Sequence, residues 1–456
     1  MPQTDIVALP FAELARLMAA GSLNSETLVT ECLARTARLD DGLHAFVNVY
    51  PQAAMDAARR LDRERAEGRV RGPLHGIPIA VKDLADMEGH VTGFGSQVYG
   101  TAAATATAPF LRRLEDAGMI LIGKTQMVEF AFGSWGTNAA LGAPRNPRAV
   151  DRHYIAGGSS SGSAVAVAAG LVPAAIGSDT GGSVRIPAAL CGTVGLKTSW
   201  GAVSTRGVAP LSPTFDTIGP LTHHIDDARL IFEAMREPET GPRERQASSI
   251  IVRTPQRAEL DPLAPSVAAT FLASIAALSE QGFSAQPLVL PRKFVDYQSD
   301  TGAIMAKEAY DALRHLVDDP DLPLDPAVRS RVRQGAGISD EAYDALVAAR
   351  RDALERLDDL LGDGDVILLP TTPMPACPLA DVDETLFPMS RLTRLANYLD
   401  LCAISVPVAT TADGLPIAMQ ICARSGREDL AMSVAVSLLA AMQQRSLASE
   451  NQPQAR

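Results

Sequence analysis

Short apolar segments alternate with helical segments from Ile77 onward, and this alternation constrains the fold more than any other feature of the chain. A strand-like run at residues 77–81 is followed by a helical pattern at 109–117 and another strand-like run at 119–122. Such alternation is typical of strands that run mainly parallel between layers of helices. Strand-like runs return at residues 366–369, 403–408 and 416–421. We therefore predict an α/β fold with a mixed, mainly parallel central sheet flanked by helices on both faces.

The overall charge argues against two classes of partner. The 456-residue chain has a formal net charge of −12 at pH 7, so phosphate backbones and anionic membrane surfaces would repel it. Its first residues form no basic, apolar leader, and no apolar run is long enough to cross a bilayer. We expect a cytoplasmic protein that binds neither nucleic acid nor membrane.

The five cysteines and seven histidines form no pattern of metal ligands. The cysteines contain no C-x-x-C pair, and no two histidines are spaced as H-x-x-x-H. We expect reduced thiols, no metal and no cofactor.

Lysine is rare, since only five of the 41 basic residues are lysines. One of them, Lys82, ends the apolar run that starts at Ile77, and this position favours burial of its amine. A desolvated lysine can lose its proton near pH 7 and act as a base, whereas arginine cannot. The plainer alternative is a strand-end lysine that pairs with Asp83.

Two turns rich in glycine and serine follow, at residues 157–163 and 177–185. Turns of this kind present backbone N–H groups that can stabilise a negative charge. The plainer interpretation of each segment is an ordinary turn or a helix cap that binds no ligand. Neither is a P-loop, because no lysine precedes the hydroxyl residue. Residues 158–162 match the G-x-S-x-G elbow of α/β-hydrolases with Ser160 as nucleophile. That interpretation fails because no apolar strand precedes them and no histidine follows His315.

Segments spread over nearly the whole chain resemble the amidase signature family. The resemblance rests on residues 72–83 (GPLHGIPIAVKD), 157–163 (GGSSSGS), 181–187 (GGSVRIP), 191–197 (CGTVGLK), 369–373 (LPTTP) and 414–420 (GLPIAMQ). These motifs stand in the family's order and spacing. We therefore expect the amidase signature fold and chemistry that cleaves C–N acyl bonds.

The resemblance also implies roles for individual residues. Lys82 would be the base, Ser159 the relay and Ser183 the nucleophile of a Ser-cisSer-Lys triad, with a cis peptide bond leading into Ser159. Asp179 and Arg185 match an acid and a base of the family, and we expect them to form a supporting ion pair. The oxyanion hole would consist of the N–H groups of Thr180, Gly181, Gly182 and Ser183.

Residues 123–135 resemble the family's pocket wall, which places Ala131, Phe132 and Trp135 beside the substrate. Aromatic side chains there favour an apolar or aryl substrate, although packing in the core is the plainer interpretation. Ser161 departs from the family, which commonly has glycine there, and its side chain could narrow the space near the relay.

We predict a hydrolase that cleaves small amides through an acyl-enzyme on Ser183, with carbamates, urethanes and esters as further substrates. Its partner would be a small molecule, and a homodimer is one option for its assembly. The alternative is the A subunit of a glutamine-dependent tRNA amidotransferase, which shares the motifs and works in a complex. A non-catalytic binding protein on this scaffold would normally have lost a triad residue, and here all three are present.

With no clear linker in the sequence, we predict a single amidase domain over residues 1–443 and a polar tail at 444–456. Within the domain, we expect a helical N-terminal part at 1–70 and the catalytic signature core at 72–224. A variable, mostly helical substrate region would follow at 225–361, and residues 362–443 would supply C-terminal strands and a helix.

Overall fold

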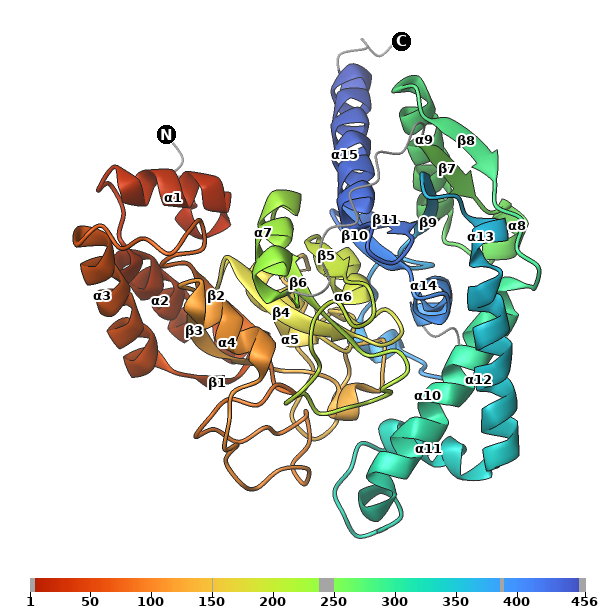
Figure 1. The fold of residues 1–456 in the computed structure, drawn as a ribbon, viewed down its shortest axis with the longest axis horizontal. Helices are drawn as coiled ribbons and strands as arrows, with labels where there is room; N and C mark the ends of the chain where they lie inside the picture. Colours follow the sequence, from red (N-terminus) through yellow and green to blue (C-terminus); the bar gives the residue numbers. More distant parts are fainter. Residues whose placement is uncertain (1–4, 150, 238–249, 386–388, 451–456) are drawn as a thin grey trace.

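The computed structural model describes residues 5–149, 151–237, 250–385 and 389–450. Among these residues, eleven strands form one sheet in the order β1-β3-β2-β4-β6-β5-β10-β11-β9-β7-β8 (Figure 1). The strands are β1 (Phe46–Val49), β2 (Pro78–Lys82), β3 (Ile120–Thr125), β4 (Ala174–Asp179), β5 (Val194–Lys197), β6 (Thr217–Thr222), β7 (Ile251–Thr254), β8 (Ser284–Pro287), β9 (Asp365–Pro370), β10 (Cys402–Thr410) and β11 (Pro416–Ala423).

The sheet is mixed, as predicted. Strand β2 pairs in parallel with β3 and β4, and β7 pairs in parallel with β8 and β9. The other six strand pairs among the described residues are antiparallel, so "mainly parallel" was wrong for the sheet as a whole. A short connection explains one of these pairs, since five residues join β10 to β11 and a parallel pair needs a longer crossover.

Helices flank the sheet on both faces, which confirms that part of the prediction. Helices α5 and α6 contact each other on one face, and α7, α15 and α9 contact one another in succession on the other (Figure 1). The helices are α1 (Phe11–Ala19), α2 (Ser25–Leu43), α3 (Pro51–Ala66), α4 (Pro109–Asp116), α5 (Ser161–Ala168), α6 (Arg185–Cys191), α7 (Ile225–Met235), α8 (Arg257–Leu260), α9 (Pro265–Glu280), α10 (Phe294–Val317), α11 (Pro326–Arg333), α12 (Asp340–Glu355), α13 (Leu357–Leu360), α14 (Arg394–Tyr398) and α15 (Glu428–Glu450).

The N-terminal part contains the predicted helices and one strand that the sequence analysis missed. Strand β1 lies between α2 and α3 and pairs with β3. Strand β8, in the region expected to be mostly helical, was also missed. Each strand has only four residues, too few to show a periodic pattern. Their pairing partners, which are distant in sequence, decide their structure.

Helix α15 differs from the prediction at its C-terminal end. It continues to Glu450, so the segment predicted as a polar tail from residue 444 begins inside a helix. Its residues include Gln, Arg, Leu and Ala, which favour helix whether or not they are buried. Residues 451–456 of the predicted tail lie outside the described residues.

Two neighbouring parallel strands position the candidate site. Strand β2 ends at Lys82 and β4 ends at Asp179, and these strands pair in parallel. Their carboxyl ends therefore lie at the same edge of the sheet, where open α/β sheets commonly bind ligands. Helix α5 begins at Ser161, and α6 begins at Arg185, two residues after Ser183. The two glycine-rich turns are thereby brought to the same edge as Lys82.

Candidate active site

Lys82 is completely buried at the end of β2. Its Nζ lies 2.7 Å from Ser159 Oγ and 2.8 Å from Ser178 Oγ. The plainer alternative, a pair between Lys82 and Asp83, does not form. Asp83 instead forms an ion pair with Lys124, whose Nζ is 3.1 Å from Asp83 Oδ1, because consecutive side chains of a strand point to opposite faces.

Burial changes the protonation of Lys82. It lowers the pKa of the amine from its ordinary value to about 7, against the smaller opposing effects of the Asp216 and Asp179 carboxylates. A substantial fraction of the amine is therefore neutral at neutral pH, as a base that takes a proton from a hydroxyl must be. Lys197 is also buried, but its Nζ donates to the carbonyl groups of Leu401 at 2.8 Å and Thr198 at 3.0 Å.

Ser159 and Ser183 occupy adjoining turns. The Gly158–Ser159 peptide bond is cis, as the resemblance predicted. The backbone N–H of Ser160 donates to the Ser183 carbonyl at 3.2 Å and so ties the turns together. In the described part of the chain, no hydrogen bond joins the Ser159 and Ser183 hydroxyls, and such catalytic bonds often tighten only when substrate binds.

The predicted oxyanion loop needs one correction. The Gly182 N–H donates to Asp179 Oδ1 at 2.8 Å, so it is not directed at a substrate. Among the described residues, the N–H groups of Thr180, Gly181 and Ser183 have no acceptor. Gly182 has a φ of +123°, and a Cβ there would lie 2.2 Å from Thr393 Oγ1. Glycine is therefore needed at this position to let the chain approach Thr393.

Asp179 and Arg185 form the expected ion pair, and both side chains are fully buried. Arg185 Nε and Nη2 donate to the two Asp179 oxygens at 3.0 and 2.9 Å. Burial alone would raise the pKa of Asp179, but the Arg185 guanidinium outweighs it and holds that pKa well below its ordinary value.

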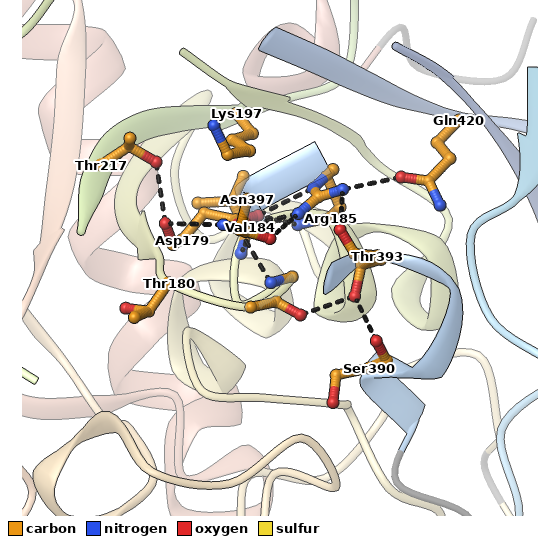
Figure 2. A network of polar contacts seen from close by, with 12 residues as sticks. Asp179, Thr180, Val184, Arg185, Lys197, Thr217, Ser390, Thr393, Asn397 and Gln420 are labelled. Atoms are coloured by element: carbon orange, nitrogen blue, oxygen red, sulfur yellow. Dashed lines mark hydrogen bonds and ion pairs between the residues drawn. The ribbon is translucent and has the colours of Figure 1, made fainter. Parts of the chain in front are cut away.

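The ion pair is the centre of a larger network (Figure 2). Arg185 also donates to Gln420 Oε1 at 2.7 Å, to Asn397 Oδ1 at 2.8 Å and to the Thr393 carbonyl at 3.0 Å. Thr393 Oγ1 donates in turn to the Gly181 carbonyl at 2.6 Å. The network thus joins the turn that carries Ser183 to α14 and β11, which lie some 200 residues later in the chain.

A buried carboxyl group holds the other side of the turn. Thr180 Oγ1 donates to Asp216 Oδ1 at 2.6 Å, and the N–H groups of Leu211 and Ser212 donate to Asp216 Oδ2. Burial raises the pKa of Asp216 to about 6, although these hydrogen bonds act in the opposite direction. Thr180 is therefore held in place by its side chain, while its N–H has no acceptor in the described part of the chain.

A cavity opens onto Ser183. The three predicted wall residues, Ala131, Phe132 and Trp135, line it together with Gly181. Phe130, the other aromatic residue of the predicted wall segment 123–135, does not line the cavity but packs in the core, with its ring centroid 5.8 Å from that of Phe94. The other lining residues are Gly133, Ser134, Ile186, Met305, Arg331, Glu384, Ser390 and Arg394.

Several residues of the site were missed by sequence reasoning. Ser178 lies within the quoted 177–185 motif, and the two-residue period of a strand places it on the same side as Ile176 and Thr180, so a signal for it existed. Gln420 ends a quoted motif, but nothing indicated its contact with Arg185. No pattern pointed to Asp216, Arg331 or Arg394, because isolated charged residues are usually solvated.

The Ser161 hydroxyl lies at the start of α5, buried and without a hydrogen-bond partner among the described residues. Ser161→Ala is expected to raise the free energy of unfolding by about 1 kcal/mol, because it removes an unpaired buried hydroxyl and alanine favours helix. Urea unfolding measures the change. The matched control is Ser163→Ala, since Ser163 Oγ bonds to Thr125 Oγ1 at 2.7 Å and to the Ile176 carbonyl at 3.1 Å. That substitution should destabilise, and equal losses from both would contradict the prediction.

Two further observations concern the described residues as a whole. None of their helices combines the length and the apolar character required to cross a membrane. Within the same part of the chain, no three or more His, Cys, Asp or Glu side chains are grouped so that they could hold a metal ion.

Comparison with known proteins gives matches along most of the chain. A family model described as Amidase matches residues 27–432. A 2-amino-5-chloromuconic acid deaminase from Comamonas testosteroni is 34% identical over 429 residues, which cover 91% of this chain and 92% of that protein. The A subunit of a glutamyl-tRNA(Gln) amidotransferase from Salinispora arenicola is 32% identical over an alignment of 487 positions, which covers 96% of this chain and 98% of that protein. A solved crystal structure of an amidase superposes with a TM-score of 0.86 at 31% identity, with 95% and 99% covered.

Proposed function

The chain belongs to the amidase family, and from this premise we propose that it hydrolyses amide bonds of small molecules through an acyl-enzyme on Ser183. One observation carries the proposal. A buried lysine with a pKa of about 7 lies 2.7 Å from the Ser159 hydroxyl, in the turn next to the one that carries Ser183. This arrangement supplies a base, a relay and a nucleophile at one edge of the sheet.

The proposed reaction follows the order of these groups. Neutral Lys82 takes the proton of Ser159, which takes the proton of Ser183 as Ser183 attacks the carbonyl carbon. The N–H groups of Thr180, Gly181 and Ser183 stabilise the oxyanion. The C–N bond then breaks, the relay returns a proton to the departing amine, and water hydrolyses the acyl-enzyme. A hydrogen bond to Ser178 Oγ at 2.8 Å also positions Lys82.

The same acyl chemistry would extend to carbamates, urethanes and esters, which also place a leaving group on a carbonyl carbon. Phe132 and Trp135 line the cavity and support an apolar part in the substrate. We also propose a cytoplasmic location and a small molecule as the partner. The net charge of −12 argues against nucleic acid and anionic membranes as partners, because it repels anionic surfaces. A homodimer is the assembly that we propose to test first, since it is the commonest one for soluble enzymes.

The relative from Salinispora arenicola supports a second candidate, the A subunit of a tRNA amidotransferase. A protein of this kind would hydrolyse glutamine and copurify with other chains. Turnover of anilides by the lone chain, without glutaminase activity, would count against it.

Trapping the acyl-enzyme tests the main proposal. The purified chain is incubated with an aryl carbamate, whose acyl group should leave the enzyme slowly, and its intact mass and peptide map are measured. We expect the mass of one carbamoyl group, located on Ser183, and none in Ser183→Ala. A panel of p-nitroacetanilide, malonamide and glutamine then defines the substrates. Hydrolysis that survives in Ser183→Ala, or a label on another residue, would overturn the mechanism.

A further inference from the structure

Two guanidinium groups converge on the cavity beside Ser183. Arg331 comes from α11 and Arg394 begins α14, and both line the cavity together with Gly181 and Ser183. The two arginines are 63 positions apart in the sequence, so only the packing of α11 and α14 brings them together. Neither takes part in the chemistry proposed above.

Arg394 has no acidic partner among the described residues. Its Nη1 donates to the Gln298 carbonyl at 3.1 Å, whereas its buried Nε has no hydrogen-bond partner. Burial, reinforced by the charge of Arg331, lowers the pKa of Arg394 to about 10, so the group stays positively charged at neutral pH. A buried donor without an acceptor is costly, and Arg394 lines a cavity that a ligand can enter.

Arg331 has one acidic partner, Glu384, which bonds only its Nη1. Its buried Nε and Nη2 have no partner in the described part of the chain. The other Glu384 oxygen already accepts a hydrogen bond from Thr137 Oγ1 at 2.6 Å. Two guanidinium groups and one carboxylate therefore line the cavity, and each oxygen of that carboxylate already accepts a hydrogen bond. The lining of the cavity carries an excess positive charge in a chain whose net charge is −12.

The positive charge lies close to the turn that carries the nucleophile. Arg394 Nε is 3.7 Å from the point where a Cβ on Gly181 would lie. Arg331 Nη2 is 3.2 Å from the corresponding point at Gly133, another residue of the cavity lining. An anionic group bound between the arginines would thus be separated from a carbonyl carbon at Ser183 by only a few bonds.

We propose that the substrate carries a carboxylate that binds between Arg331 and Arg394, a few carbon atoms from the amide that Ser183 cleaves. The guanidinium fork matches the geometry of a carboxylate, and the empty donors are those that such a group would fill. A half-amide of a short dicarboxylic acid fits this description, and its hydrolysis by water would release ammonia and the dicarboxylic acid. This inference rests on the proposed function and adds a charged group to the apolar part of the substrate that Phe132 and Trp135 support.

Binding without turnover tests the inference. Succinamic acid and its uncharged counterpart butyramide are titrated into Ser183→Ala by calorimetry, because this variant should bind an amide without cleaving it. We expect succinamic acid to bind at least 30-fold more tightly than butyramide, and Arg394→Gln in the same background to reduce this ratio to below threefold. Arg331→Gln is the second test variant, in case Arg394→Gln does not fold.

Arg333→Gln is the matched control, since it removes the same charge from α11. The Arg333 side chain is 57% exposed, pairs with Asp318 and does not line the cavity, so the ratio should stay near 30. Equal binding of the two ligands, or a preference that persists in both Arg394→Gln and Arg331→Gln, would overturn the inference. Failure here is distinct from failure of the proposed function. A wild type that is acylated on Ser183 but shows no preference for the acid would contradict only the carboxylate site.

Discussion

Lys82→Met and Ser183→Ala are each expected to lower kcat/KM for amide hydrolysis by about 10⁴-fold, and the double variant should be no worse than either single one. The reason is that the two residues act on one proton path, through Ser159. When groups work as a unit, removal of one costs nearly as much as removal of all. Steady-state kinetics on one amide with the four proteins measures the effect. Losses that multiply in the double variant would contradict a shared path.

The pH profile supplies an independent readout for Lys82. The amine is mostly neutral only when the pH exceeds its pKa of about 7. Wild-type kcat/KM should therefore rise about tenfold per pH unit below pH 7 and level off above it. The residual activity of Lys82→Met should not show this rise of kcat/KM with pH. Lys293→Met is the control, because Lys293 is exposed, and its profile should match that of the wild type.

Arg185→Leu is expected to lower the free energy of unfolding by about 3–5 kcal/mol, because it leaves the carboxylate of Asp179 buried without a counterion. It also removes the hydrogen bonds to Thr393, Asn397 and Gln420, which hold the nucleophile turn against α14 and β11 (Figure 2). Activity should fall together with stability, because Asp179 also accepts a hydrogen bond from the N–H of Gly182, the residue before the nucleophile Ser183. Urea unfolding and kcat/KM are measured together.

Two variants make the ion-pair prediction specific. Asp179→Asn combined with Arg185→Leu should recover part of the loss, since no unpaired charge then stays buried. Arg59→Leu breaks an exposed pair with Glu26, whose side chains are 50% and 41% exposed, and should change stability by less than about 1 kcal/mol. A change for Arg185→Leu as small as that for Arg59→Leu would show that the buried pair does not hold the turn.

Much of the fold could be predicted from sequence because its longer elements carry a local signal. The apolar runs that became β2, β3, β9, β10 and β11 were recognisable from the local sequence pattern, as was helix α4. Strands β1, β5, β6 and β8 were not, and neither was the majority of antiparallel pairs. Four-residue strands carry almost no periodicity, and strand direction depends on how distant segments meet.

The features of the candidate site also fall into two groups, those that the sequence predicted and those that only the structure showed. Lys82, Ser159 and Ser183 lie in motifs that resemble those of the amidase family, and this resemblance predicted their roles. The hydrogen bond from the Gly182 N–H to Asp179, and the second contact of Lys82 with Ser178, depend on atomic positions that a motif does not specify.

The sequence by itself determined the family, the mixed sheet between helices, and the residues that are chemically able to act as base, relay and nucleophile, because each of these depends on residue types in a local pattern. Only the tertiary structure decided that Asp83 pairs with Lys124 rather than Lys82, and that Arg331 and Arg394 share a cavity with Ser183. These contacts join residues far apart in the chain. The packing of whole helices and strands sets the distances between them, and no local pattern records that packing.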